Sequence, residues 1–198
     1  MLGGIRHELT VRAITGWLAR EPAAGVRREC VKALTRLGLP EVLPVVERTL
    51  ADAAASVRLA AVHAVYRLAG PGSAITLVPI LRDENEDVRR RAATCIGWLG
   101  EKRLAGDLSP LLADGSAAVR CAALEAMENL RSRQVVPRVI ELLDDPEESV
   151  RQRAFGVLGA ITGERMADTL PEDEASRQRL IARWRARWKK ESRIAGTE

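Results

Sequence analysis

The sequence is poor in aromatic residues and contains no long apolar run. Phe, Tyr and Trp together make up only 3% of the 198 residues, whereas 46% are hydrophobic and 29% are charged. This balance excludes a disordered chain, and the shortage of Tyr, Phe and Thr favours helices over strands. No apolar run approaches the roughly 18–20 residues of a membrane span, and the first residues lack the apolar core of a signal peptide. We therefore expect a cytoplasmic protein, of bacterial type.

Cysteine is also scarce, and its spacing is not that of a metal site or of a Cys-x-x-Cys pair. Cys30, Cys95 and Cys121 give an odd count without a Cys-x-x-Cys pair. A zinc site needs four closely spaced ligands, and neither His7 nor His63 lies near a cysteine in the sequence. We expect three free thiols that behave as small apolar side chains, no metal site and no cofactor.

A Val-Arg pair recurs along most of the chain at a constant spacing of 31 residues. The pairs are Val26-Arg27, Val57-Arg58, Val88-Arg89, Val119-Arg120 and Val150-Arg151. An aspartate keeps the same step at Asp52, Asp83, Asp114 and Asp145. A fixed period in this range indicates a repeat protein, in which each repeat is one supersecondary unit.

The spacing within one repeat is helical. Val88, Ala92, Cys95, Ile96 and Leu99 fall on one face of a helix. A shorter apolar segment precedes each such helix, so each repeat is expected to be a pair of antiparallel helices that buries its apolar face only in a stack. Five pairs are expected at about 8–38, 39–70, 71–100, 101–131 and 132–162, followed by a loop and a C-terminal helix within 163–198. Pro79 and Pro110 should kink the first helices of their pairs.

The Asp, the Val-Arg pair and the prolines at Pro44 and Pro137 resemble the HEAT repeat, in the short form of the phycobilin-lyase-like (E/F-type lyase subunit) family. The resemblance covers about residues 8–162. It implies an all-α fold, an α-α superhelix or HEAT-repeat solenoid. It also implies that the repeated charges form a structural ladder between layers, made by Arg58, Arg89, Arg120, Arg151, Asp52, Asp83, Asp114 and Asp145. Function does not follow, because such stacks serve many unrelated tasks.

The outward stripe of each Val-Arg helix is where a partner is expected to bind. In HEAT-like stacks this helix lines a concave groove. The first three repeats place a cluster of basic side chains there, and exposed Trp and Arg are typical interface anchors. The candidate partner-binding residues are Arg28, Lys32, Leu59, His63, Arg67, Arg90, Arg91, Trp98 and Glu125. An acidic segment of another protein is the natural complement of this surface.

The C-terminal segment breaks the period and is strongly basic. Residues 172–198 hold eight basic and five acidic side chains. Leu180, Ile181, Trp184 and Trp188 share one helical face. This helix could cap the last repeat, lie on an anionic membrane or on nucleic acid, or bind a partner. We favour the cap.

The sequence shows no nucleophile beside a base, no phosphate-binding glycine loop and no metal spacing, so we expect no enzyme. The leading hypothesis is a scaffold or adaptor that binds a partner protein in its groove. One alternative is a nucleic-acid-binding solenoid that uses the basic groove residues and the C-terminal helix. The other, suggested by the resemblance, is a lyase-like or chaperone-like accessory subunit for a cofactor-bearing protein.

Overall fold

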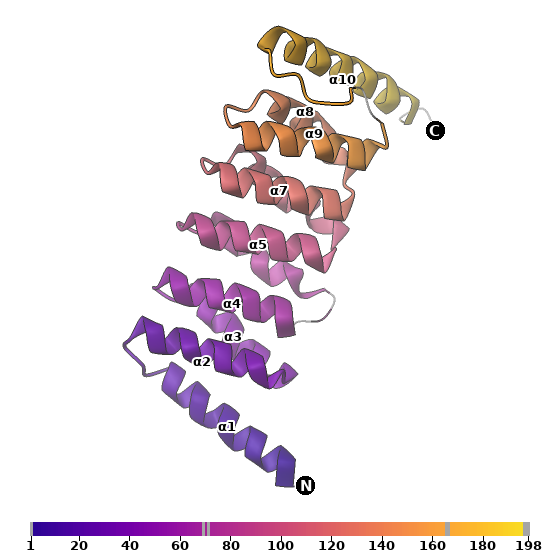
Figure 1. The fold of residues 1–198 in the computed structure, drawn as a ribbon. Helices are drawn as coiled ribbons and strands as arrows, with labels where there is room; N and C mark the ends of the chain where they lie inside the picture. The colour runs from indigo at the N-terminus through magenta and orange to yellow at the C-terminus, as the bar shows by residue number, and fades with distance from the viewer. Residues whose placement is uncertain (1, 69, 71, 165–166, 196–198) are drawn as a thin grey trace. The chain divides into compact units, whose positions relative to one another are not determined.

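A computed structural model describes residues 2–68, 70, 72–164 and 167–195, and all regular structure within these ranges is helical (Figure 1). The chain forms two compact units, Met1–Cys95 and Ile96–Glu198. The boundary between the units falls inside one helix. No helix among the described residues is long and apolar enough to cross a membrane. The boundary expected at 162–163 remains a prediction.

The first unit begins with the long helix α1, which packs on α2, the second helix of the first pair. α1 starts at Leu2, before the start expected for the first pair. The elements are α1 (Leu2–Leu18), α2 (Ala24–Leu37), η1 (Pro40–Val42), α3 (Leu43–Arg48), η2 (Thr49–Ala51), α4 (Ala55–Leu68), η3 (Ser73–Arg82) and the first part of α5 (Glu86–Leu99). α2 packs on both α1 and α4, and α3 packs on α4.

The second unit repeats the same alternation and ends in a long helix. Its elements after α5 are η4 (Lys102–Leu104), α6 (Ala105–Leu108), η5 (Ser109–Ala113), α7 (Ala117–Leu130), η6 (Arg133–Val135), α8 (Val136–Glu141), η7 (Leu142–Asp144), α9 (Glu148–Thr162) and α10 (Glu174–Ala195). α7 packs on α9, and α8 packs on both α9 and α10.

Proline breaks the first helix of the later pairs into short turns. Pro44 and Pro137 stand in the first turns of α3 and α8, and Pro110 is the second residue of η5. Pro79 lies inside η3, which is a 3-10 helix over its whole length. Proline lacks an N–H group and its ring collides with the preceding turn. The sequence therefore predicted kinked helices where the structure has successive short 3-10 and α-helical segments.

The second helices are uniform by comparison, and α2, α4, α5 and α7 are each 14 residues long. Gly38 closes α2 with a φ angle of 67°, a left-handed conformation that glycine adopts without strain. α7 ends instead on Arg131, whose φ angle is 50°. Because these helices begin at equivalent positions of the repeat, each Val-Arg pair lies at the same point in its helix.

The repeated small and branched residues form the cores of both units. Val57 is fully buried, and Val88, Val119 and Val150 are at most 1% exposed. The alanines in the next column, Ala61, Ala92, Ala123 and Ala154, are also fully buried. Val26 departs from its column, because 44% of its surface is exposed. The first pair is thus the least regular one in packing as well as in sequence.

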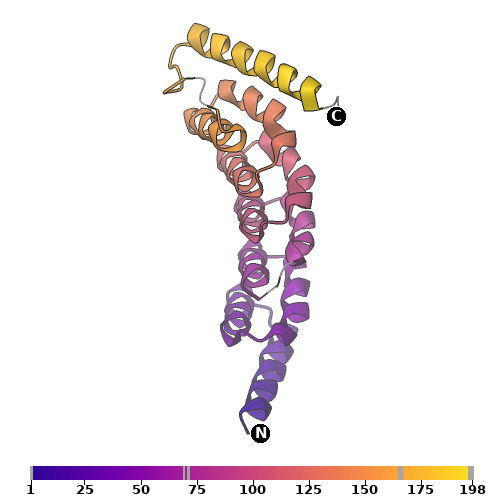
Figure 2. The ribbon, with the colours of Figure 1, turned by 90° about the vertical axis from the view of Figure 1, so that its right-hand side faces the viewer.

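The C-terminal helix α10 docks on the last repeat of its own unit. Leu180, Ile181 and Trp184 are 2–3% exposed, and α10 packs on α8 and η7. Figure 2 shows this helix, in yellow, lying across the end of the orange helices. Trp188 is partly buried, and the guanidinium of Arg133 lies 5.4 Å from its ring centroid. The apolar face of α10 is therefore occupied within the chain.

Candidate functional site

The repeated Arg and Asp side chains bind each other in forked pairs. Arg58 donates from Nε to Asp83 Oδ2 at 2.6 Å and from Nη2 to Oδ1 at 2.8 Å. Their side chains are only 8% and 6% exposed. Parallel charge-assisted hydrogen bonds of this kind are strong and geometrically specific. The same fork joins Arg27 to Asp52 and Arg120 to Asp145.

These side chains also fasten the loops that precede the second helices. In every repeat the remaining Nη1 of the arginine donates to main-chain carbonyls five and six residues earlier, as Arg58 does to Asp52 and Ala53 at 2.9 and 3.0 Å. The same bonds are made by Arg27, Arg89, Arg120 and Arg151. With the fork and these bonds both made, Arg27, Arg58 and Arg120 have little capacity left for a ligand.

Each aspartate of the column accepts a hydrogen bond from the main-chain amide two residues later, such as Asp52 from Ala54 at 2.8 Å. Asp83, Asp114 and Asp145 do the same. In the first repeat Glu21 takes this place and accepts from Ala23. The Arg27 guanidinium, with the Ala54 amide, holds the pKa of the Asp52 carboxyl below its ordinary value.

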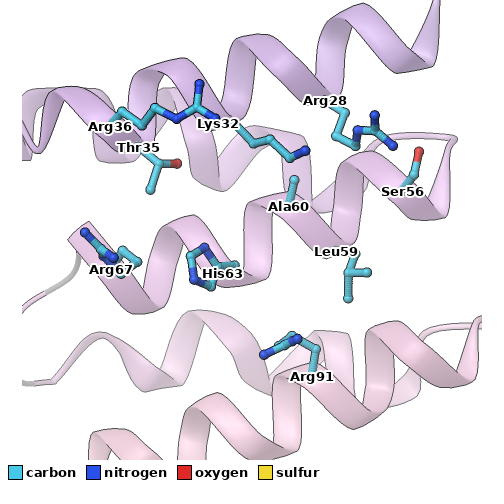
Figure 3. A pocket seen from close by; sticks show the side chains of 10 residues that line it. All are labelled: Arg28, Lys32, Thr35, Arg36, Ser56, Leu59, Ala60, His63, Arg67 and Arg91. Carbon is cyan, nitrogen blue, oxygen red and sulfur yellow. The ribbon is translucent and has the colours of Figure 1, made fainter.

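A pocket of about 580 Å³ lies on the first unit, on the outward faces of three consecutive second helices (Figure 3). We call it the basic pocket. α2 contributes Arg28, Lys32, Thr35 and Arg36, α4 contributes Ser56, Leu59, Ala60, His63 and Arg67, and α5 contributes Arg91. The helices are regular and of equal length, so side chains one period apart lie at corresponding points along neighbouring helices.

The structure brings six of the nine candidate partner-binding residues into the basic pocket. They are Arg28, Lys32, Leu59, His63, Arg67 and Arg91. The candidate list omitted Thr35, Arg36, Ser56 and Ala60, which also line it. The 31-residue period could have indicated two of these four residues. Arg36 precedes Arg67, and Ala60 precedes Arg91, by one repeat.

The other three candidates lie outside the basic pocket. Arg90 turns to its own helix and pairs with Asp87 at 2.8 Å. Trp98 and Glu125 belong to the second unit. Trp98 is 52% exposed, and Glu125 pairs with Arg153 at 2.7 Å. Whether these three residues bind a partner remains a prediction.

The lining of the basic pocket carries five cationic side chains and no carboxylate. Lys32 and Arg28 share Glu29 of the same helix, at 2.9 and 3.2 Å, and Lys32 is the main reason that the pKa of Glu29 is lowered. Within the described part of the chain, no ion pair is formed by Arg36, Arg67 or Arg91. The pocket is therefore a patch of positive charge that Glu29 compensates only in part.

His63 lies among these cationic side chains. Partial burial and the cations Arg91 and Arg67 lower the pKa of its imidazole from the ordinary value of 6.5. At neutral pH the ring is uncharged and offers one donor and one acceptor nitrogen.

The rest of the lining is largely apolar. Leu59 and Ala60 are partly buried, and the hydroxyl of Thr35 is used within its own helix, where it donates to the Val31 carbonyl at 2.7 Å. Thr35 therefore offers mainly its methyl group to a ligand. A pocket with apolar walls and cationic side chains suits a ligand that has an apolar body and negative charges.

The described residues contain no cluster of three His, Cys, Asp or Glu side chains that could hold a metal ion. Burial raises the pKa of the Cys95 thiol to about 11 and also raises the pKa of Cys30 and Cys121. These thiols are therefore protonated at neutral pH, and the thiolate is the reactive form of cysteine.

This stack of helix pairs is an α-solenoid of the HEAT and armadillo kind. The sequence matches the HEAT repeats family over residues 1–65, 46–116, 74–131 and 105–188. The chain thus belongs to the HEAT-repeat family, and the predicted all-α superhelical fold class is confirmed. No match of comparable significance exists among curated proteins.

Three solved structures illustrate the likeness. The complex of CpcE and CpcF of phycocyanin lyase from Nostoc matches at a TM-score of 0.64 and 19% identity, over 78% of this chain and 65% of that one. YibA of Escherichia coli matches at 0.63 and 18%, over 92% and 68%. A designed armadillo repeat protein in complex with the peptide (KR)4 matches at 0.57 and 20%, over 75% and 80%. The phycobilin-lyase-like resemblance is confirmed, and at these identities the likeness is one of fold alone.

Proposed function

We propose that this protein is a non-catalytic scaffold or adaptor that binds an acidic segment of a partner protein in the basic pocket. One observation carries the proposal. Five cations line the pocket without any carboxylate, and Arg36, Arg67 and Arg91 form no ion pair within the described residues. Exposed, unpaired arginines are ready to form forked hydrogen bonds with carboxylates.

The exposure of its charged side chains also distinguishes this pocket from the structural ladder. The ladder arginines Arg58 and Arg120 are buried and paired, whereas Arg36 and Arg67 are exposed. Complementary charge gives an interface its specificity and speeds association. The designed armadillo protein with the peptide (KR)4 supports the idea that a solenoid of this kind binds a short charged segment. In the present chain the pocket is basic, so the matching segment is acidic.

The pocket geometry also supports a non-catalytic role. The lining holds one imidazole, His63, and one hydroxyl that is not already bonded within its own helix, Ser56. They stand seven residues apart on α4, a rise of about 10 Å along the helix axis. That separation is far beyond the hydrogen-bond reach that nucleophilic catalysis needs.

The proposal can be tested by affinity capture from a cell lysate with three versions of the chain. The wild type is compared with an Arg36→Glu, Arg67→Glu variant and with an Arg183→Glu, Arg185→Glu variant. The last pair carries the same charge change on α10 in the other unit. We expect a partner that is retained by the wild type and the α10 variant and lost by the pocket variant. A peptide array of that partner should then locate binding in an acidic segment. Equal capture by all three versions would contradict the proposal.

A nucleic-acid-binding role is the second candidate, and α10 favours it. Arg183, Arg185, Lys189 and Lys190 are exposed and form no ion pair within the described part of the chain. Phosphate binding through such side chains weakens steeply as salt rises. Salt-labile binding of a nucleic acid duplex that is lost in the Arg183→Glu, Arg185→Glu variant would support it. The lyase-like alternative rests on the fold likeness to CpcE and CpcF alone.

A further inference from the structure

We infer that the acidic group held in the basic pocket is a phosphate monoester, carried by a phosphorylated side chain of the partner segment. This inference rests on the proposed function and names the chemical group that the same pocket binds. It follows from the kind of cation that is left unpaired, from the positions of these cations on neighbouring helices, and from the way in which carboxylates bind arginine elsewhere in this chain.

The cations that are left unpaired in the pocket are all arginines. Arg36, Arg67 and Arg91 form no ion pair within the described residues, whereas Lys32, the one lysine of the lining, is bound to Glu29 at 2.9 Å. A guanidinium presents its N–H groups in a planar fork that matches the oxygens of a phosphate, whereas an ammonium acts as a point charge. The cations that remain available are thus of the type best suited to phosphate.

Arg36 and Arg67 occupy corresponding points on two packed helices. They are 31 residues apart, near the ends of α2 and α4, and α2 packs on α4. Both side chains are exposed, and Figure 3 shows them at the same end of the pocket. The axes of packed helices lie about 8–10 Å apart, so two long, unpaired arginines on such helices can turn toward one group between them.

His63 adds a donor beside these two arginines. It precedes Arg67 by four residues on α4, and side chains at this spacing are neighbours on a helix. Partial burial lowers the pKa of His63, and so do the cations Arg91 and Arg67, which places both guanidinium groups within electrostatic range of the ring. The uncharged imidazole has one N–H group that can donate to a phosphate oxygen. A phosphate at this end of the pocket therefore meets donors from both α2 and α4.

In the buried forks of this chain, each carboxylate binds a single arginine. Both oxygens of Asp83 accept from Arg58, and both oxygens of Asp145 accept from Arg120. A phosphate monoester carries about −1.5 to −2 charges at pH 7 and has three acceptor oxygens, so it can accept from two arginines at once. Two unpaired arginines at corresponding points of neighbouring helices therefore match one phosphate better than one carboxylate.

The remaining lining explains why a segment, rather than a free ion, carries the phosphate. Leu59 lies at the other end of the pocket, eight residues before Arg67 and about 12 Å from it along the axis of α4. Leu59 and Ala60 are partly buried apolar side chains. A phosphate bound at the end with Arg36 and Arg67 leaves this surface uncovered, and the chain that flanks a phosphorylated residue can cover it. An extended chain needs about four residues for this distance.

The test uses three labelled peptides of equal length and fluorescence anisotropy at one neutral pH and one salt concentration. All three have neutral Gly-Ser flanks with a leucine four residues from the centre on each side. The first carries one phosphoserine at the centre, the second carries Glu-Glu there with the same charge, and the third carries unmodified serine. We expect the phosphopeptide to bind at least tenfold more tightly than either of the others. An Arg36→Gln, Arg67→Gln variant should lose this preference, and an Arg183→Gln, Arg185→Gln variant should keep it.

A competition experiment separates the possible sources of the phosphate. Inorganic phosphate and the unlabelled phosphopeptide are each titrated against the labelled complex. Inorganic phosphate should need at least a tenfold higher concentration than the phosphopeptide, because it covers none of the apolar surface. Equal potency would show that the pocket takes a free anion, and would overturn the assignment to a phosphorylated segment.

The outcomes also separate this inference from the proposed function. If the Glu-Glu peptide binds as tightly as the phosphopeptide and both are lost in the pocket variant, the phosphate assignment is wrong and acidic-segment binding stands. If no peptide binds while the pocket variant still loses its partner from a lysate, the phosphate assignment is again wrong and the proposed function stands. If phosphopeptide binding is unchanged by the pocket substitutions, both are wrong.

Discussion

Arg58 and Asp83 are separated by 25 residues in the sequence and are joined by two hydrogen bonds, of 2.6 and 2.8 Å. Both side chains are more than nine-tenths buried. Removal of one partner of such a pair leaves the other charge buried without compensation, which typically costs about 3–5 kcal/mol. We expect Asp83→Ala to lower the free energy of unfolding by about 3 kcal/mol, in urea denaturation followed by circular dichroism.

The matched control is Asp87→Ala in the same unit. Asp87 pairs with Arg90 at 2.8 Å, but their side chains are 59% and 42% exposed. Exposed pairs contribute about 0–1 kcal/mol, so this variant should be close to wild type. Equal losses in the two variants would show that the buried fork has no special role in stability.

A second prediction concerns the packing of α5 on α7 in the second unit. A Cβ atom built on Gly97 would lie 2.7 Å from the Cα atom of Ala126, and 2.8 Å from its Cβ atom. Because main-chain atoms cannot yield cheaply, we expect Gly97→Ala to destabilise the protein by about 1–3 kcal/mol. Thermal unfolding by calorimetry would measure this as a lower Tm.

Gly156 offers the opposite case. It lies inside α9, and a Cβ atom there would meet nothing within 4 Å. Alanine restricts the unfolded chain and favours the helix, so Gly156→Ala should raise stability by about 0.5–1 kcal/mol. If both alanine variants changed the Tm in the same direction, the close packing of α5 on α7 would not explain why position 97 is occupied by glycine.

Most of the fold could be predicted because its determinants repeat. The Val-Arg and Asp columns recur at one spacing of 31 residues. Arg58 shows why the spacing is constant, because it binds the loop of its own repeat and also Asp83 of the next repeat. The broken first helices were harder to predict. Pro79 was expected to kink an α-helix, but its missing N–H and its ring are accommodated in a 3-10 helix. Sequence periodicity does not distinguish these outcomes.

The site was predictable only in part, because the period says which side chains face outward but not which of them converge. Arg90 and Arg91 were both candidates. Arg91 lines the basic pocket, whereas Arg90 folds back to Asp87 on its own helix. Arg36 was omitted from the candidates although it precedes Arg67 by one repeat. Side-chain length and local ion pairs decide these differences.

A third prediction concerns Trp184 on α10. Its side chain is 3% exposed and packs with Leu180 and Ile181 in the interface with the last repeat. Truncation of a buried Trp to Ala removes a large apolar area and leaves a cavity, at a cost of about 3–5 kcal/mol. Trp17 is 73% exposed, so Trp17→Ala should cost far less. Chemical denaturation and protease sensitivity of residues 174–195 would measure both. If Trp184→Ala unfolds like the wild type, α10 is not a stabilising cap.

The fourth prediction is a pH dependence of ligand binding that acts through His63. Burial and the cations Arg91 and Arg67 lower the pKa of His63 in the free protein. Lys32 and Arg36 of α2 add positive charge to the same pocket. A bound carboxylate offsets this repulsion, so the pKa of His63 should be higher in the complex than in the free protein. The complex should therefore take up a proton as it forms.

The sign of the effect follows from linkage. Because the bound state holds its proton more tightly, affinity for an acidic segment should rise as the pH falls from neutral through the range in which His63 titrates. Below about pH 4.5 the carboxylates of the ligand become protonated and the gain is lost. Calorimetry in two buffers with different ionisation enthalpies would measure the proton uptake directly. His63→Gln should bind without proton uptake and with little pH dependence as long as the carboxylates of the ligand stay ionised. If wild type and variant exchange the same number of protons, His63 does not sense the ligand.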